Sequence, residues 1–365
     1  MNPIKSIIWN LGWLHRTVDP LLGQRRYAQR TLRDKRNTIV FTLCNSSMSL
    51  KIKELWGRSN AWFDFYNTVG DSSKTHLYFP DDWFYDYVDA KMNKWRLSPI
   101  IDDKSLYDFY FYDVTRPKTL ATCQDGQWLN DNYYITGIDD IADICKTVGK
   151  FIVKPSFGSS GGKGISFWQE GDGSVKDLIS QYNNCVVQSI IEQHADLAVL
   201  HPKSINSIRI MTLLLDGEVK ILSSVLRLGV GNSKVDNVSS GGVACGIDEK
   251  GYLREMSFNA KGQSWNGHPD GLKLKGRKVP SYDECCEISK RIAPRFVRFS
   301  RLISWDFAVD KNGKPLLIEA NLYGGELDFH QMCNGPIFGD EKMTKEMIAR
   351  FFIKNKSQKW KELLT

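Results

Sequence analysis

Two acidic residues near the end of the chain lie where a β-hairpin would place them opposite each other. Asn312-Gly313 separates two apolar runs and is typical of a two-residue type I′ turn. With that turn Asp306 pairs with Glu319, and Asn321 shares their face because side chains alternate along a strand. Directly opposed carboxylates repel each other unless a cation lies between them. Two carboxylates and an amide oxygen suit Mg²⁺, so the pattern predicts a magnesium site; the alternative is that one carboxylate turns to solvent.

A second pattern joins a lysine to a loop of small residues. Lys154 ends a short apolar run, and the segment 156–164 that follows is rich in serine and glycine. The backbone N–H groups of such a loop can converge on phosphate oxygens. The Walker A spacing is missing because glycine follows Lys163, and a strand rather than a helix comes next, unlike the dinucleotide pattern. Alone the loop could be a flexible hairpin, but beside a magnesium pair it indicates a nucleotide site.

Length and composition set the frame for these motifs. The 365 residues correspond to two or three domains, with 42% hydrophobic and 25% charged residues. These ordinary values exclude disorder, collagen and coiled coil as descriptions of the whole chain. No run approaches the roughly 18–20 apolar residues of a membrane-spanning helix. The eight cysteines form no C-x-x-C pair, so we expect reduced thiols, no zinc site and a cytoplasmic location.

Positive charge is concentrated at the N-terminus. Residues 1–60 contain eleven Lys and Arg against three Asp and Glu, a balance of +8, whereas the whole chain carries +7. Such a basic arm can contact a membrane surface or a polyanion such as a glycan, and the alternative is a solvated helix face. The basic stretch has no RNA-binding signature and no interleaved aromatic residues, so no nucleic acid partner is expected.

Hydrophobic periodicity and turn residues predict an α+β architecture. Helices are expected over 138–150, from Ser281 to about Leu302 with a capping box formed by Ser281 and Glu284, and over 341–364. Strands are expected over 151–153, 164–168, 185–188, 208–215, 219–226, 242–246, 304–309 and 316–320. Asp216-Gly217 marks a second hairpin turn. Antiparallel hairpins mixed with helices favour α+β over a doubly wound parallel sheet.

The order of these motifs resembles that of the ATP-grasp superfamily. Asp103-Lys104 precedes a helix, Lys154 lies on a strand before the serine/glycine loop, a hinge strand follows, and Trp305-Asp306 and Glu319-Ala320-Asn321 close the series. Three stretches are closer to the branch called sugar-transfer-associated ATP-grasp: SINSIR at 204–209, GGVACGID at 241–248, and the Glu319-Ala320-Asn321 triplet. The resemblance runs from about Leu77 to Gly339.

The resemblance implies an ATP-grasp fold, in which two α+β subdomains built on antiparallel sheets clasp ATP. The implied divisions are a basic N-terminal extension (1–75), an N-terminal or linker part (76–150), a small lid subdomain (151–200), a large subdomain with the metal site (201–340) and a C-terminal amphipathic helix (341–365).

Roles for single residues also follow from the resemblance. Lys104 and Lys154 would contact ATP phosphates, and Arg209, with Lys154, would act in catalysis by stabilising the charge that develops during transfer. The loop residues expected to close over the phosphates are Ser159, Ser160, Gly161, Gly162 and Lys163. The residues expected around adenine and ribose are Gln188, Ile190, Ile191 and Glu192. The expected metal ligands are Asp306, Glu319 and Asn321. The expected substrate contacts are Arg227, Gly241, Gly242, His268, Gly324, Gly325 and Glu326; for Arg227 a surface ion pair is the alternative.

The resemblance further implies an ATP- and Mg²⁺-dependent ligase that joins a carboxylate to an amine through an acyl phosphate. The acceptor would be a small-molecule or glycan carboxylate, and amidation of a sugar acid by an amino acid in capsule or lipopolysaccharide synthesis fits the name of the branch. Two alternatives stay open. One is a kinase that phosphorylates a sugar hydroxyl, and the other is a nucleotide-binding scaffold without catalysis.

Overall fold

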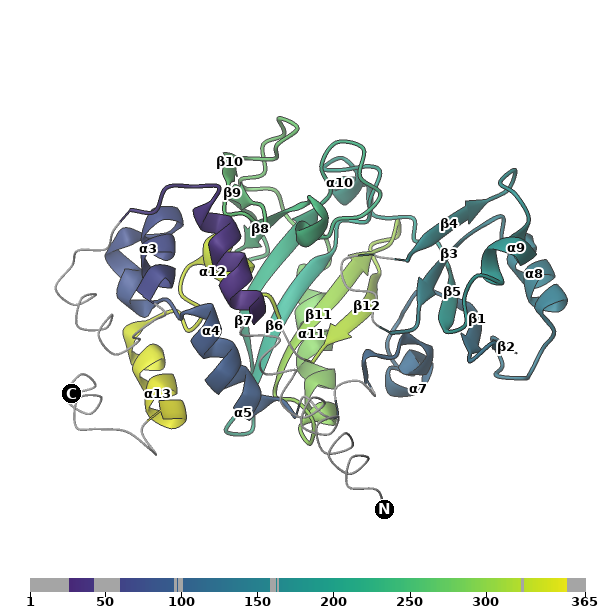
Figure 1. Ribbon diagram of the computed structural model, residues 1–365, viewed down its shortest axis with the longest axis horizontal. Coiled ribbons are helices and arrows are strands. Elements are labelled where there is room, and N and C mark those ends of the chain that lie inside the picture. The colour runs from purple at the N-terminus through teal and green to yellow at the C-terminus, as the bar shows by residue number, and fades with distance from the viewer. Residues whose placement is uncertain are drawn as a thin grey trace, which may run out of the picture.

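Two antiparallel sheets lie next to each other in the structure, a computed structural model that describes residues 26–42, 60–94, 97, 101–157, 162, 164–322 and 325–352. The smaller sheet has five strands in the order β2-β1-β5-β3-β4, and the larger has seven in the order β10-β9-β8-β7-β6-β11-β12. Figure 1 shows the small sheet at one end of the molecule and a group of helices at the other, with the large sheet between them. The predicted α+β class is confirmed.

The small sheet has its own core. Its strands are β1 (Thr119–Gln124), β2 (Gln127–Asn130), β3 (Lys150–Pro155), β4 (Ser166–Gln169) and β5 (Cys185–Ser189). Helices α8 (Ile138–Thr147) and α9 (Val175–Ile179) pack on it and bury Ile141 and Ile179 against Phe151. Because β1 pairs with β5, the predicted division at residue 151 cuts through this sheet.

The large sheet is covered on both faces. Its strands are β6 (Ile208–Leu215), β7 (Glu218–Leu228), β8 (Val243–Ile247), β9 (Leu253–Phe258), β10 (Ser264–Asn266), β11 (Leu302–Val309) and β12 (Pro315–Asn321). Helix α11 (Tyr282–Ile292) packs on one face, over a core that contains Trp305 and Phe307. On the other face helices from both ends of the chain share a core with Met211 and Val225.

The helices on that second face come from distant parts of the sequence. They are the helical residues 26–36, α3 (Asn60–Val69), α4 (Asp81–Trp83), the π-helical turn Phe84–Asp89, α5 (Ala90–Met92), α12 (Leu327–Asn334) and α13 (Glu341–Phe352). In Figure 1 the purple N-terminal helix lies beside α12. The C-terminal helix was predicted to reach residue 364, and its part beyond Phe352 lies outside the described residues.

The hairpin that carries the acidic residues has the predicted pairing but not the predicted turn. Asp306 pairs with Glu319, whereas Val309 pairs with Pro315, and the N–H of Asp310 donates to the carbonyl of Lys314, so the three residues 311–313 form the loop in place of a two-residue turn. Gly313 takes the left-handed conformation that this loop needs, with φ +83°. A bulge at Ile318 then restores the register, because one extra residue on β12 faces a single residue on β11. The Asp216-Gly217 turn has two residues, as predicted.

Other elements depart from the expectation for local reasons. Helix α11 ends at Ile292 rather than near Leu302, because Pro294 follows in a 3₁₀ turn and proline has no N–H for a helical hydrogen bond. The capping box is wrong. Ser281 is left-handed and its hydroxyl donates to the carbonyl of Gly313. Strands β2, β9 and β10 were missed, and β10 has only three residues, too few for a periodic signal.

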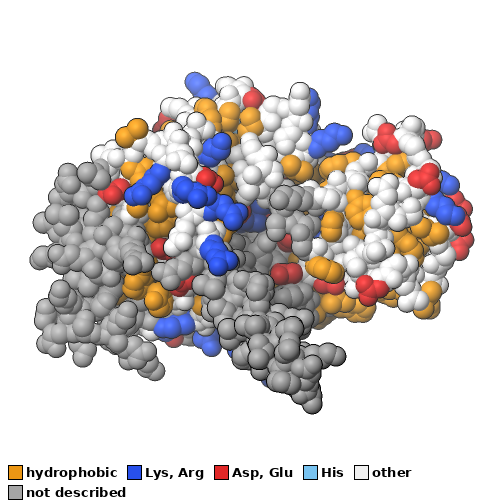
Figure 2. All heavy atoms as spheres, in the orientation of Figure 1, with side chains coloured by type: hydrophobic (Ala, Val, Ile, Leu, Met, Phe, Trp, Pro, Cys, Tyr) orange, Lys and Arg blue, Asp and Glu red, His pale blue; other side chains and the backbone are white. Residues whose placement is uncertain are grey.

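The basic N-terminal region is described in part. Within the helical stretch 26–36, Arg26 and Arg30 face solvent, while Ala28 and Lys35 are buried. Figure 2 shows Lys and Arg side chains gathered over this part of the molecule. Among the residues that the structure describes, no helix has both the length and the apolar character needed to cross a membrane.

Helix α12 lies so close to β8 that an added methyl group would not fit. The Cβ of an alanine at Gly246 would lie 2.6 Å from the backbone oxygen of Cys333. We expect Gly246→Ala to lower the free energy of unfolding by about 1–3 kcal/mol, because a tightly packed contact must open. Gly173→Ala is the matched control, since nothing lies within 4 Å of its added Cβ. Urea unfolding of both variants checks this, and equal stability would contradict the close contact.

Candidate active site

The centre of the candidate site is a buried pair between neighbouring strands. Arg209 on β6 lies opposite Asp306 on β11, and the guanidinium donates twice, from Nε to Oδ1 at 2.7 Å and from Nη2 to Oδ2 at 2.8 Å. The side chains are 7% and 1% exposed. Arg227 on β7 adds a third bond, from Nη2 to Asp306 Oδ2 at 3.0 Å. The site therefore has a planar, charge-assisted hydrogen-bond network on one face of the large sheet.

These contacts determine the ionisation of the site. Burial alone would raise the pKa of Asp306, but Arg209 and Arg227 outweigh it and hold the pKa below the ordinary value. Burial lowers the pKa of Arg209, but the charges of Asp306 and Glu326 reverse this and raise it. Both groups are thus ionised at neutral pH. Arg227 was left open as a surface ion pair, and that alternative is wrong, because its guanidinium is buried against Asp306.

The second carboxylate of the hairpin faces a lysine. Lys104, in the 3₁₀ turn Lys104–Leu106, places Nζ 2.9 Å from Glu319 Oε1. Asn321 lies on the same face, with Nδ2 3.4 Å from Asp306 Oδ2. The repulsion that we expected between the two carboxylates is thus relieved by side chains, so it does not by itself require a metal ion.

The donor set still fits Mg²⁺. Glu319 is 32% exposed with one lysine partner, and Asn321 is partly exposed beside it, so both offer oxygen ligands. Asp306 is the most engaged of the three, because both of its oxygens already accept from guanidinium N–H groups. Among the described residues, no group of three or more His, Cys, Asp and Glu is placed to hold a metal ion.

The small sheet contributes a second lysine. Lys154 on β3 donates from Nζ to Gln188 Oε1 on β5 at 3.2 Å. The pKa of Lys154 is lowered to about 8, mainly because the side chain is buried; the negative charge of Glu319 raises the pKa and the positive charge of Lys104 lowers it. The backbone N–H of Lys104 donates to the carbonyl of Ser156 at 2.7 Å, so the two lysines come from adjoining segments. Lys104, Lys154 and Glu319 therefore meet where the two sheets approach each other.

Most of the predicted phosphate loop lies outside the described residues. Ser159, Ser160, Gly161 and Lys163 belong to that part, and so does Gly324 in the expected substrate segment. Gly162 is described and is left-handed, with φ +75°. At the start of the loop, the buried hydroxyl of Ser156 has no hydrogen-bond partner within the described structure. Their contacts with phosphate remain predictions.

Glu192, in the linker after β5, was expected to contact ribose, and the structure shows it paired with two lysines. Its carboxylate accepts from Lys150 at 2.8 Å and from Lys311 at 2.7 Å, and these two bonds lower its pKa to about 2. Lys150 begins β3 of the small sheet and Lys311 lies in the β11–β12 loop, so Glu192 links both sheets. A ribose contact of Glu192 would have to compete with both lysines. Ile190 and Ile191 precede it in the linker, and their contacts with adenine stay predictions.

The expected substrate residues have distinct surroundings. Glu326, at the start of α12, is left-handed (φ +59°) and its carboxylate pairs with Arg209. Gly325 lies against the sheet, since an added Cβ would be 2.5 Å from Ser304 Oγ. Gly241 has φ +104°, and at Gly242 an added Cβ would lie 2.6 Å from the carbonyl oxygen of Asp236.

His268 is held by its own surroundings. Its Nε2 lies 2.8 Å from the carbonyl oxygen of Gly229, and Nδ1 accepts from the N–H of Asp270 at 3.1 Å. Burial lowers its pKa. Both ring nitrogens are therefore already engaged, and a substrate contact of His268 stays a prediction.

Arg227 is held by Ser207 and Asp236, to which the sequence had assigned no role. Ser207 Oγ accepts from Arg227 Nε at 2.9 Å, and Asp236 accepts from both the N–H and the hydroxyl of Ser207. Ser207 belongs to the SINSIR stretch, which was the available signal. No local pattern distinguished Asp236, which is brought to the site by the loop between β7 and β8.

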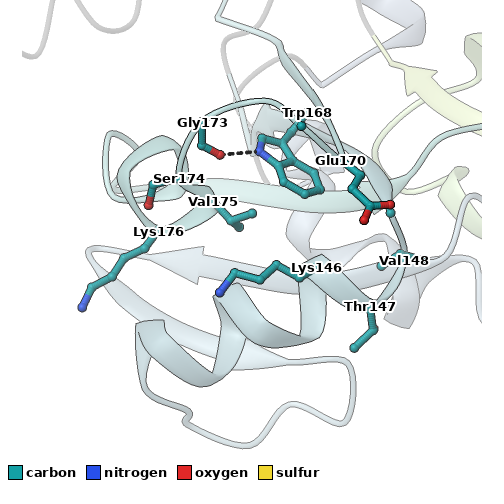
Figure 3. Close-up of a pocket in the computed structure, with 11 residues that line it drawn as sticks. Lys146, Thr147, Val148, Trp168, Glu170, Gly173, Ser174, Val175 and Lys176 are labelled. Carbon is teal, nitrogen blue, oxygen red and sulfur yellow. Dashed lines mark hydrogen bonds between the residues drawn. The ribbon is translucent and has the colours of Figure 1, made fainter.

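A hollow of about 660 Å³ lies away from this site. It is formed on the small sheet by the end of α8, the end of β4 and the start of α9, and Figure 3 shows Lys146, Trp168 and Lys176 around it. None of its lining residues belongs to the predicted nucleotide or metal site. Lys146 and Lys176 pair with Asp143 and Asp139.

One protein-family profile matches most of the chain. A profile described as sugar-transfer associated ATP-grasp matches residues 85–345, more than two thirds of the chain. The chain belongs to this family. The match includes Lys104, Lys154, Arg209 and the Asp306–Asn321 hairpin. It leaves out the helical residues 26–36, α3 and α4. None of the curated proteins compared with the chain matches it.

Three of the solved structures that resemble the chain show low sequence identity to it. N5-carboxyaminoimidazole synthetase from Staphylococcus aureus has 9% identity over 64% of this chain and 51% of its own, with a TM-score of 0.36. Biotin carboxylase from Campylobacter jejuni has 16% identity over 72% and 48%, with 0.41. The ATP-grasp ligase PsnB has 15% over 78% and 71%, with 0.39. The chain thus spans about half the length of the first two, and these similarities carry no argument about substrate.

The pKa of Lys154 makes a testable prediction for the family's ligand. A lysine that contacts phosphate must be protonated, so the dissociation constant for ATP should rise above pH 8, approaching tenfold per pH unit. Lys154→Arg keeps its charge and should lose this dependence. Titration of ATP binding between pH 7 and 9.5 for both proteins checks the prediction. Parallel curves for wild type and variant would remove Lys154 from the phosphate site.

Proposed function

We propose that this protein is an ATP- and Mg²⁺-dependent ligase that joins a carboxylate to an amine with release of ADP and phosphate. One observation carries the proposal. Lys104 and Lys154 meet Glu319 where the two sheets approach, and Glu319 on β12 pairs with Asp306 on β11, which in turn binds the buried Arg209 on β6. Family membership supports ATP as the co-substrate.

The residues of the chain would act by position and charge. Lys104 and Lys154 would bind the phosphates of ATP, and Arg209 would stabilise the negative charge that develops when the γ-phosphoryl group passes to the acceptor carboxylate. Glu319, Asn321 and Asp306 would hold Mg²⁺, which neutralises phosphate charge when bound. Attack of the amine on the acyl phosphate then forms the amide and releases phosphate.

This route needs no covalent nucleophile from the protein, and the cysteines agree with that. The seven cysteines that the structure describes are buried. Burial raises their pKa values, so they stay protonated and weakly nucleophilic at neutral pH.

For the acceptor we propose a sugar acid, amidated by an amino acid in the cytoplasm during capsule or lipopolysaccharide assembly. The family description and the arginine-lined site support an acidic acceptor. A kinase that leaves phosphate on a sugar hydroxyl would use the same metal face and is the second candidate. A scaffold without catalysis is disfavoured by the intact Lys104, Lys154 and Arg209. Contact of the basic N-terminal region with a membrane surface or a polyanion belongs to the same proposal.

Mass spectrometry distinguishes the two reactions. The protein is incubated with ATP, Mg²⁺, nucleotide-linked uronic acids and a pool of amino acids. The ligase gives ADP, free phosphate and a product equal in mass to acid plus amino acid less water. ADP with phosphate retained on the sugar would indicate the kinase, and bound but unconsumed ATP would favour the scaffold.

Glu319→Gln tests the metal face. The change removes the charge of the more exposed of the two candidate carboxylate ligands, and we expect turnover to fall by about 100-fold or more with the fold intact. Glu255→Gln on β9 is the control, because its surface pair with Lys275 lies on another part of the sheet. ADP release and circular dichroism are measured for both, and wild-type turnover in Glu319→Gln would refute the metal assignment.

A further inference from the structure

Lys35 is a basic residue of the N-terminal region that points into the protein. Its side chain has no exposed area, and Nζ donates to Asp328 Oδ2 at 2.8 Å and to the carbonyl of Ala260 at 2.7 Å. The ammonium group also lies 5.1 Å from the ring centre of Phe65 and 5.8 Å from that of Phe329. A lysine is rarely buried to this degree unless its charge is paired, so this contact is a specific one.

The partner of Lys35 lies in the first turn of α12. Asp328 is 1% exposed, and its other oxygen, Oδ1, has no hydrogen-bond partner within the described structure. A second buried carboxylate, Asp81, lies near Asp328. Burial and the negative charge of Asp328 both raise the pKa of Asp81. Lys35 therefore places its ammonium group 2.8 Å from this buried carboxylate, between two elements that are far apart in the sequence.

The same turn carries Glu326, the residue that pairs with Arg209. Glu326 is left-handed, with φ +59° and ψ +58°, a conformation that costs free energy for a residue with a side chain. Contacts nearby must hold it there. The N–H of Leu327 donates to the hydroxyl of Tyr85 at 3.0 Å, and Asp328 is fixed by Lys35. These two contacts fasten the residues directly after Glu326.

We propose that Lys35 is a positioning residue: by fixing Asp328 it holds the first turn of α12, and with it Glu326, against Arg209. Its effect on turnover rests on the proposed function. The family match begins at residue 85, so this support comes from a part of the chain that the family profile does not include. The N-terminal region is thus a structural part of the active site.

The test uses the full chain and a pair of substitutions. Lys35→Met alone leaves Asp328 buried without a counter-charge and can prevent folding, so the main variant is Lys35→Met with Asp328→Asn, which removes both charges. Trp62→Phe is the control. Trp62 lies in the same buried cluster, and its ring nitrogen has no hydrogen-bond partner among the described residues.

Hydrogen–deuterium exchange measures the positioning directly. In the double variant, amides of residues 326–330 should exchange about tenfold faster or more, while those of β8 beneath α12 and of α3 keep their wild-type rates. In Trp62→Phe, the amides of residues 326–330 should not exchange faster relative to those of β8 and α3. Unchanged exchange at 326–330, or an equal increase in α3, would overturn the proposal.

Turnover tests the consequence for the reaction. With ATP, Mg²⁺ and the acid and amine mixture above, we expect kcat for ADP release to fall about tenfold with KM for ATP unchanged. In a Glu326→Gln background the double substitution should add little, because both changes act through one contact. The role in catalysis would be overturned if the effect of the double substitution multiplied with that of Glu326→Gln, or if the double variant kept the wild-type kcat. If the wild type released no ADP, the proposed function would fail, while exchange would still decide whether Lys35 holds Glu326.

Discussion

The bidentate contact between Arg209 and Asp306 is the interaction on which the rest of the site depends. It joins β6 to β11 through side chains as well as backbone, and it lies where solvent does not screen it. Removal of either partner would leave a buried charge without its bidentate counter-charge, at a cost of up to about 3–5 kcal/mol. Arg227 and Glu326 attach to the two ends of this pair, and Ser207 and Asp236 attach to Arg227. The site is therefore one network rather than a set of separate ligands.

The network also shares its sheet face with the helical core. Arg209 and Met211 are two residues apart on β6 and point to the same side, one into the site and the other into the cluster of N-terminal and C-terminal helices. Packing in that cluster and geometry in the site are thus coupled through single strands. This explains why residues from both ends of the chain, far outside the nucleotide motifs, matter for the position of α12.

The sequence predicted the parts of this arrangement that depend on local pattern. Alternation and turn residues were enough for β6, β7, β8, β11 and β12 of the large sheet and for the opposition of Asp306 and Glu319, although a bulge rather than the turn produces that register. Lys35 was counted with a solvated basic face or an anionic contact, because charge alone does not show that its helical position falls in line with the buried Ala28. Partners such as Asp236 and Asp328 depend on tertiary packing, which no local pattern encodes.

The hairpin of β11 and β12 also receives both chain segments that connect the sheets. On the way into the small sheet, the carbonyl of Thr115 accepts from the N–H of Leu317, and on the way out, the N–H of His194 donates to the carbonyl of Val309. The two segments are joined to each other where Ser189 donates to Lys118. The small sheet thus forms an inserted module whose two ends lie side by side, an arrangement in which an insertion disturbs its host least.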